Sequence, residues 1–140
     1  MKIVDANVLL YAVNRQSAQH QTAHRWLTNA LSGSEVVGLP WVSLLAFVRL
    51  STSRRIFASP LSPGDAMTLV ESWLAQPAAV TVEPTTRHLS VLRGLLEQAG
   101  TAGNLTTDAH IAALAIEHGA TVVTFDRDFE RFGVGVQLPV

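Results

Sequence analysis

Short apolar runs alternate along this chain with longer segments whose apolar residues recur every three or four positions. The short runs predict strands, because a strand needs only four to eight residues while a helix usually needs ten or more. We expect four strands and one further edge strand, at residues 3–4, 35–39, 79–82, 121–124 and 134–138.

The longer segments predict helices. Ser62 followed by Pro63 is a strong helix start, with Asp65 three residues after the cap, and Gly100 and Gly119 are typical stops. Thr86 and Thr107 are expected to cap the two helices before those glycines. The expected helices are residues 17–31, 42–50, 63–77, 87–99 and 108–118, with a helical or buried segment at 8–13 and an acidic turn at 126–132.

Strands separated by helices of this length imply parallel strands joined by helical crossovers. We therefore expect a three-layer α/β/α fold around a central, mainly parallel sheet of four to five strands. The chain has 140 residues, so residues 1–140 are expected to form one domain.

This topology is expected to bring three carboxylates together in a candidate site. Asp5 comes directly after the first strand, Asp126 follows the strand at 121–124, and Asp108 begins the helix that leads into that strand. Ligands of a parallel sheet bind beyond the carboxyl ends of its strands, so all three are expected at one edge. Asp128 is close enough in sequence to reach the same site or its rim.

Each aspartate could instead be a helix cap or a favourable charge at a helix N-terminus. Their convergence favours chemistry, because clustered carboxylates repel one another unless a cation lies among them. The cation that suits such a cluster is Mg²⁺, with Mn²⁺ as a substitute. Zinc is disfavoured, since there is no cysteine and the five histidines are scattered in sequence.

Composition changes the picture in two ways. The net charge is −1 and only 15% of the residues are charged, with a mean hydropathy of +0.26. So little charge predicts that another chain covers part of the surface, as in a homodimer. No apolar run approaches the length of a membrane span, and no signal peptide precedes Ile3, so we expect a cytoplasmic protein without membrane contact.

Three motifs carry the acidic residues: the opening Ile3-Val4-Asp5-Ala6-Asn7, the block 103–115, and the segment 121–129, which reads TVVTFDRDF. They resemble PIN-domain ribonucleases, and most closely the VapC toxins of type II toxin–antitoxin modules, in particular their mycobacterial group. The opening is similar to the start of these proteins, the block 103–115 to their central acidic helix, and 121–129 to their final Asp-x-Asp segment.

The resemblance implies an Mg²⁺-dependent endoribonuclease that is usually dimeric and is neutralised by a small VapB antitoxin. It implies that Asp5, Asp108 and Asp126 are catalytic metal ligands, with Asp128 a weaker candidate. Asn7 and Thr124 would be polar groups beside the ligands, although Asn7 could be only a helix-start residue.

One departure concerns the helix at 42–50. Many PIN domains have a glutamate there, where this chain has Ala46. This favours a single bound ion over two, and it leaves open a degenerate PIN module that binds RNA or an antitoxin without cutting. Arg49 is the only charge on that helix, so we expect it to pair with a cluster carboxylate or, less in keeping with its apolar surroundings, to contact substrate phosphate.

Nine of the ten cations are arginines, which suits phosphate recognition but also fits a coding bias. The candidate RNA contacts are Arg15, Arg54, Arg55, Arg127 and Arg131. A different Mg²⁺ phosphohydrolase is disfavoured. A haloacid-dehalogenase-like enzyme would need an aspartate where Asn7 stands, and a receiver-like protein would need a lysine near the last strand, whereas Lys2 is the only lysine.

Overall fold

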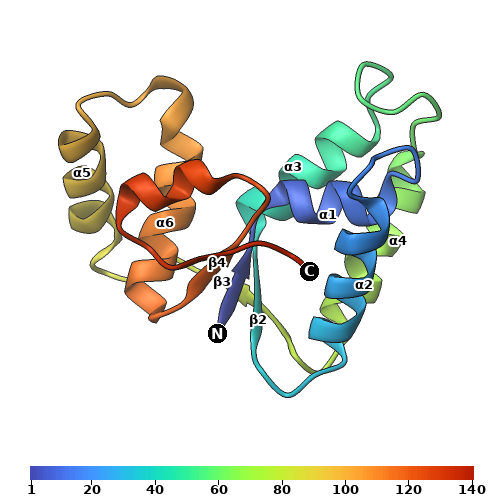
Figure 1. Ribbon diagram of the computed structural model, residues 1–140, viewed down its shortest axis with the longest axis horizontal. Helices are drawn as coiled ribbons and strands as arrows, with labels where there is room; N and C mark the ends of the chain where they lie inside the picture. The colour runs from blue at the N-terminus through green and yellow to red at the C-terminus, as the bar shows by residue number, and fades with distance from the viewer.

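The computed structural model describes all 140 residues, which form a five-stranded sheet with helices on both faces (Figure 1). The strand order is β3–β2–β1–β4–β5, and every neighbouring pair is parallel. The expected three-layer fold is confirmed. The strands are β1 (Lys2–Val4), β2 (Val37–Pro40), β3 (Ala79–Val82), β4 (Thr121–Val123) and β5 (Val136–Gln137).

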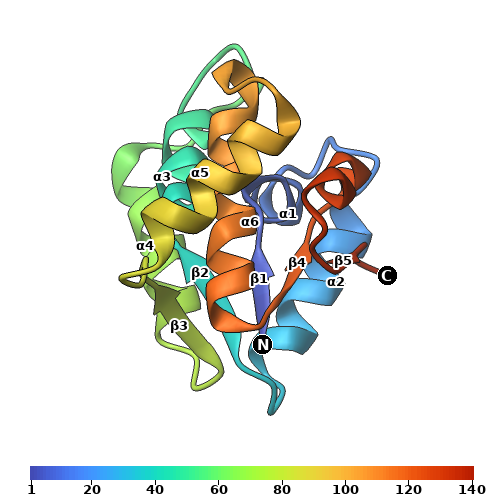
Figure 2. The ribbon, with the colours of Figure 1, turned by 90° about the vertical axis from the view of Figure 1, so that its left-hand side faces the viewer.

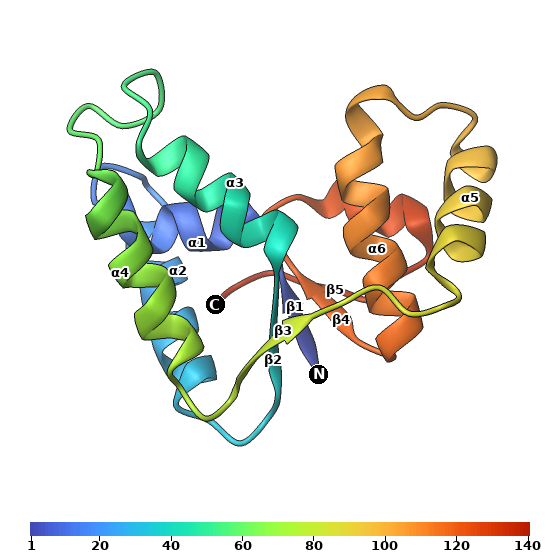
Figure 3. The ribbon, with the colours of Figure 1, turned by 180° about the vertical axis from the view of Figure 1, so that it is seen from behind.

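Two groups of helices cover the sheet, as Figures 1 and 3 show from opposite sides. The first group is α1 (Ala6–Val13), α2 (His20–Leu31), α3 (Trp41–Ser51) and α4 (Pro63–Leu74). The second is α5 (His88–Ala99) and α6 (Thr106–His118), with the 3₁₀ helices η1 (Gly103–Leu105) and η2 (Arg127–Phe132). None of the helices combines the length and apolar character that crossing a bilayer requires.

The protein has two hydrophobic cores, one on each face of the sheet, and the central strands contribute alternate side chains to each of them. Successive side chains of a strand point to opposite faces, so Val4 of β1 and Val123 of β4 join the core under α1–α4. Ile3 and Val122 join the core under α5, α6 and η2. All four side chains are completely buried. This double-sided burial explains why both the Ile3–Val4 and the Val122–Val123 pairs are apolar.

The helix ends test the capping predictions. Ser62 caps α4 as expected, with its Oγ accepting a hydrogen bond from the Asp65 amide at 3.1 Å. Gly100 and Gly119 end α5 and α6 with φ of 77° and 62°. The predicted caps at Thr86 and Thr107 are wrong.

Neither α5 nor α6 has a side-chain cap. At α6 the chain arrives through η1, so Leu105 is already helical and no extended capping residue precedes the helix. Several boundaries also differ from expectation. The helix predicted from Ser17 begins at His20, the helix predicted to end at 77 ends at Leu74, and the strand predicted at 35–39 lies at Val37–Pro40. The acidic turn at 126–132 is largely η2, and the edge strand predicted at 134–138 is present but shorter, as β5 at Val136–Gln137.

Gly38 shows how tightly the sheet centre is packed. A Cβ added there would lie 2.5 Å from Cγ2 of Val82 and 3.2 Å from Cγ1 of Ile3. We expect Gly38→Ala to lower the free energy of unfolding by about 2–3 kcal/mol through overpacking. Gly94→Ala, on α5 with no atom within 4 Å of the new Cβ, should instead stabilise slightly. Urea titrations of both variants check this, and equal effects would contradict it.

Candidate active site

The carboxyl ends of β1 and β4 meet at the centre of the sheet, as Figure 2 shows. Val4 pairs with Val123 in register, so the residues that follow, Asp5 and Thr124, lie side by side. Asp5 also caps α1, because its Oδ1 accepts from the Ala6 amide at 2.7 Å. The capping interpretation of Asp5 is therefore correct, and its role as a site residue stays a prediction.

Thr124 connects the polar groups at this edge through its hydroxyl, and it is completely buried. Its Oγ1 donates to Oδ2 of Asp5 at 2.8 Å and accepts from Nδ2 of Asn7 at 3.1 Å and from the Asp126 amide at 3.0 Å. The side-chain oxygen of Asn7 accepts from the Phe125 amide at 3.3 Å. Thr124 and Asn7 are thus polar neighbours of the carboxylates, and they fix the orientation of Asp5.

Asp108 reaches the same edge from the first turn of α6. Burial raises the pKa of Asp108 to about 6, helped by the negative charges of Asp5, Asp126 and Asp128. Burial also raises the pKa of Asp5, against hydrogen bonds from Thr124 and Ala6 that lower it. Asp5, Asp126 and Asp128 therefore act electrostatically on Asp108, which indicates that the four aspartates lie near the same edge of the sheet. Their roles as metal ligands stay predictions.

Asp126 begins η2, and its Oδ1 accepts from the Asp128 amide at 2.9 Å. Asp126 is half-buried, whereas Asp128 is exposed at the rim. None of the four aspartates forms an ion pair with an arginine, lysine or histidine. Their negative charge is therefore not compensated by a direct protein partner.

This donor set is chemically suited to a hard cation, because it consists of carboxylate oxygens without histidine or cysteine. Nevertheless, no three histidine, aspartate or glutamate side chains are close enough together to enclose an ion. Mg²⁺ is commonly held by one or two carboxylates and several waters, and the arrangement fits that mode rather than an all-protein cage.

Comparison with known proteins agrees with this geometry. The PIN domain family matches residues 2–135. Ribonuclease VapC37 of Mycobacterium tuberculosis is 56% identical over 132 residues, which cover 94% of this chain and 92% of the relative. Ribonuclease VapC33 of the same species is 42% identical over the same shares. This chain belongs to the VapC family of PIN-domain proteins.

Solved structures of VapC proteins share the fold. Mycobacterium tuberculosis VapC20, described as a sarcin-ricin loop cleaving toxin, superposes with a TM-score of 0.72 at 19% identity and covers 96% of both chains. VapBC2 from Rickettsia felis, bound to a promoter DNA fragment, gives a TM-score of 0.70 at 19% identity, covering 99% of this chain and 98% of that one.

The position of Arg49 contradicts one prediction made from the sequence of this VapC chain. Its predicted pairing with a cluster carboxylate is wrong, because Arg49 is exposed and forms no ion pair. A guanidinium in solvent needs no protein partner. Ala46, also on α3, supplies no ligand in place of the glutamate of many PIN domains.

The predicted RNA-binding arginines fall at separate places. Arg54 and Arg55 are exposed in the loop after α3. Arg127 is on η2, where it pairs with Glu130 at 3.6 Å. Arg15 follows the far end of α1, so a helix of about 12 Å separates it from Asp5. Their RNA contacts stay predictions.

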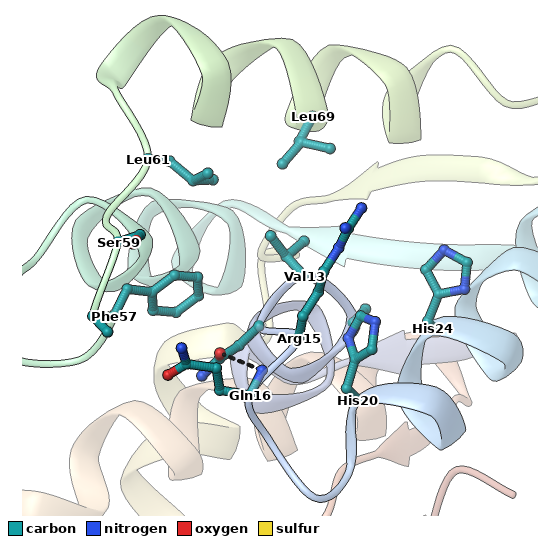
Figure 4. A pocket seen from close by; sticks show the side chains of 12 residues that line it. Val13, Arg15, Gln16, His20, His24, Phe57, Ser59, Leu61 and Leu69 are labelled. Atoms are coloured by element: carbon teal, nitrogen blue, oxygen red, sulfur yellow. Dashed lines mark hydrogen bonds between the residues drawn. The ribbon is translucent and has the colours of Figure 1, made fainter.

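The main cavities lie away from the aspartates. One of about 560 Å³ is enclosed by the end of α1, by α2 and by the loop before α4, and Figure 4 shows Arg15 extending into it between Val13 and His24. A second of about 300 Å³ continues along α2 and α4, sharing Val13, His24 and Leu69 with the first. Together they form an α2–α4 groove that no acidic residue lines.

Sequence reasoning missed a buried polar network between α5 and α6. Oε2 of Glu117 lies 2.6 Å from Nδ1 of His88, and Nε2 of His88 lies 2.9 Å from Nδ1 of His110. These two histidines, expected to be scattered, are therefore in contact. The pattern was present in the sequence, because His110 and Glu117 are seven residues apart and so share a helix face.

Proposed function

We propose that this chain is an Mg²⁺-dependent endoribonuclease, with Mn²⁺ as a substitute, acting as the toxin of a VapBC toxin–antitoxin module. The observation that carries the proposal is that Asp5, Asp108 and Asp126 lie at one edge of the sheet, where burial and then the acidic neighbours raise the pKa of Asp108. Its curated relatives at 56% and 42% identity are named ribonucleases.

The chain's own residues would hold and orient the reacting groups. Asp5, Asp108 and Asp126 would hold the ion, one or two of them directly and the rest through water, with Asp128 at the rim. Thr124 keeps Asp5 in one orientation by donating a hydrogen bond to its Oδ2, and the same hydroxyl accepts a hydrogen bond from the Asp126 amide. Bound Mg²⁺ would supply Lewis-acid polarisation of a phosphate oxygen and an acidified water. The absence of a closed cage and of a carboxylate at position 46 supports one ion rather than two.

The proposed substrate is structured RNA cut in a single-stranded loop, where bases and backbone are accessible. The proposed protein partners are a VapB-type antitoxin and a second copy of this chain. The α2–α4 groove, with an apolar floor that includes Leu27, Leu31 and Trp73, suits an amphipathic antitoxin helix. Trp41 and Leu45 on α3 and Leu89 on α5 are 43%, 61% and 78% exposed, and they supply apolar surface for a dimer.

The test is to incubate the purified chain with total bacterial RNA in Mg²⁺ and to map new 5′ ends. We expect a few discrete cuts that disappear with EDTA and in Asp126→Asn, whose amide oxygen can still accept from the Asp128 amide. Asp65→Asn, an exposed aspartate on α4, is the matched control and should cut normally.

A folded chain that binds RNA or antitoxin but makes no cuts would contradict the enzyme proposal. It would favour the degenerate PIN module, for which Ala46 and the open arrangement of the carboxylates are the supporting observations.

A further inference from the structure

Three pairs of phenylalanine, tyrosine or tryptophan rings pack edge-to-face in this protein, and one of the pairs reaches the surface. The rings of Tyr11 and Phe125 have centroids 5.2 Å apart and planes inclined at 71°. Both rings pack against the core under α1–α4, yet both residues are only half-buried. In the other two pairs no residue is more than 8% exposed: Phe47–Trp73 and Phe129–Phe132.

Backbone and side-chain contacts place this pair beside the edge of the sheet that carries the aspartates. Phe125 lies in the chain between Thr124 and Asp126, and its amide donates to Oδ1 of Asn7 at 3.3 Å. Asn7 and Tyr11 are four residues apart on α1, so they share one face of that helix. Tyr11 lies about 6 Å beyond Asn7 along the helix axis. The ring pair is therefore the next side-chain surface along α1 from the acidic edge.

The Tyr11 hydroxyl is a polar group that the fold leaves to solvent. It takes part in no hydrogen bond within the chain, and Oγ of Ser43 is the only buried polar side-chain atom without a partner. The Tyr11 hydroxyl is therefore accessible. The backbone of Tyr11 is fixed, because its carbonyl oxygen accepts from Nδ1 of His20 at 2.9 Å. Packing alone would be served by phenylalanine, whereas a surface tyrosine can contact both an apolar and a polar part of a ligand.

A nucleobase has the matching chemistry, with flat apolar faces and a polar edge. Bases of single-stranded RNA that are splayed out of a helix stack on aromatic side chains. An edge-to-face pair suits this mode, because the ring that presents its edge keeps both of its faces clear of its partner. A base is also uncharged, so the negative charge of the four aspartates does not oppose its binding as it opposes a phosphate.

We propose that Tyr11 and Phe125 form a binding site for one nucleobase of the RNA, the base next to the scissile phosphate. The proposal rests on the proposed ribonuclease function and deepens it by naming the residues that position the strand at the acidic edge. Phe47 supplies a matched control. It belongs to an edge-to-face pair of similar geometry, at 4.8 Å and 64°, but it is completely buried.

The first experiment combines protein variants with RNAs that lack one base. The RNA spans a cut mapped with the wild type, and the base on the 5′ side or the 3′ side of the scissile bond is replaced by an abasic sugar. We expect one of these two removals to lower the wild-type kcat/KM by about five- to fiftyfold, mainly through KM. Phe125→Leu should lower it by a similar factor on intact RNA and should be insensitive to that removal, because both changes delete the same contact.

Two further variants separate stacking from a disturbed site. Phe125→Trp should restore the sensitivity to base removal, since tryptophan also offers a stacking face. Tyr11→Leu, which changes no residue next to an aspartate in the chain, should behave as Phe125→Leu does. Mn²⁺ affinity, measured by calorimetry, should be the same in Tyr11→Leu, Phe125→Leu and the wild type.

The second experiment measures the affinity for oligoadenylate in the Asp126→Asn background over a range of salt concentrations. Tyr11→Leu and Phe125→Leu should each weaken binding by about five- to fiftyfold. The slope of log K against log salt should not change, because no phosphate contact is lost. Phe47→Leu should lower the midpoint of thermal unfolding but leave the affinity within about twofold.

A Phe125→Leu chain that loses the same factor as the wild type when the base is removed would overturn the proposal and leave the ribonuclease function standing. A loss of oligoadenylate affinity in Phe47→Leu as large as in Phe125→Leu would also overturn it, since packing alone would then explain both. A wild type that binds RNA without cutting it would overturn the cleavage function, and oligoadenylate binding would then decide the base site alone. A wild type that neither cuts nor binds RNA would overturn both.

Discussion

Asp108→Asn is expected to abolish RNA cleavage and, at the same time, to make the folded chain more stable at neutral pH. Asp108 is a proposed ligand, so we expect cleavage to fall by more than about a hundredfold. The gain in stability follows from the pKa of about 6, which burial first and then Asp5, Asp126 and Asp128 raise above the unfolded value of 3.8. A raised pKa means that the fold disfavours the ionised carboxylate.

The pH dependence has a definite sign. Between about pH 4 and 6 the folded chain binds more protons at Asp108 than the unfolded chain, so stability falls as pH rises through this window. Above it, the full penalty of the charge is present. We expect Asp108→Asn to raise the free energy of unfolding by about 1–2 kcal/mol near pH 7.5, after allowance for solvent screening, and by close to nothing near pH 4.

Urea unfolding at both pH values, with Asp65→Asn beside it, checks this prediction. Asp65 also lies in the first turn of its helix, so it controls for the loss of a favourable charge at a helix N-terminus. Mg²⁺ should stabilise the wild type and Asp65→Asn more than Asp108→Asn, because a ligand that binds the folded state raises its stability. A less stable Asp108→Asn at neutral pH would contradict the electrostatic account of the site.

The sequence predicted the parts of the site that topology dictates. Asp5 and Asp126 follow parallel strands, so their meeting at one edge needed no knowledge of side-chain contacts. The linkage of Thr124 to Asn7 and Asp126 could not be derived in that way, because it joins residues 117 positions apart in sequence through one hydroxyl.

The helix α3 shows where periodicity is uninformative. Trp41, Leu45 and Arg49 are spaced four apart and lie on its exposed face. Two of the three are large apolar residues, so the helix has no polar stripe to mark its outward side, and the sequence does not show that Arg49 faces solvent and not the carboxylates. The same apolar outward face is what favours a second protein chain at this surface.

The failed cap at the start of α5 has a tertiary cause. Next to the predicted cap at Thr86, the neighbouring Thr85 directs its amide and its Oγ1 to Oε1 of Glu117 at 2.9 and 2.7 Å. A carboxylate 32 residues away thus fixes the approach to α5, and local sequence rules carry no information about it.

Glu117→Ala is expected to be the most destabilising single change outside the apolar core, at about 2–4 kcal/mol. The Glu117 side chain has no exposed surface and accepts from Thr85 twice and from His88 once. Its removal would leave those half-buried donors without partners and would loosen α5 from α6, the helix that carries Asp108. Glu97→Ala is the matched control, since Glu97 hydrogen-bonds Arg93 at 2.8 Å but is 66% exposed, and it should cost less than about 0.5 kcal/mol.

The pH dependence of this contribution is opposite to that of Asp108. Burial alone would raise the pKa of Glu117, but the hydrogen bonds from Thr85 and His88 outweigh it and hold the pKa below the unfolded value of 4.5. The stabilisation is therefore present above about pH 4.5 and is lost as pH falls through the folded pKa. Unfolding measured from about pH 7 down to pH 3 should show the gap between the wild type and Glu117→Ala narrowing with acid. A gap that stays constant would show that Glu117 acts by packing and not by its charge.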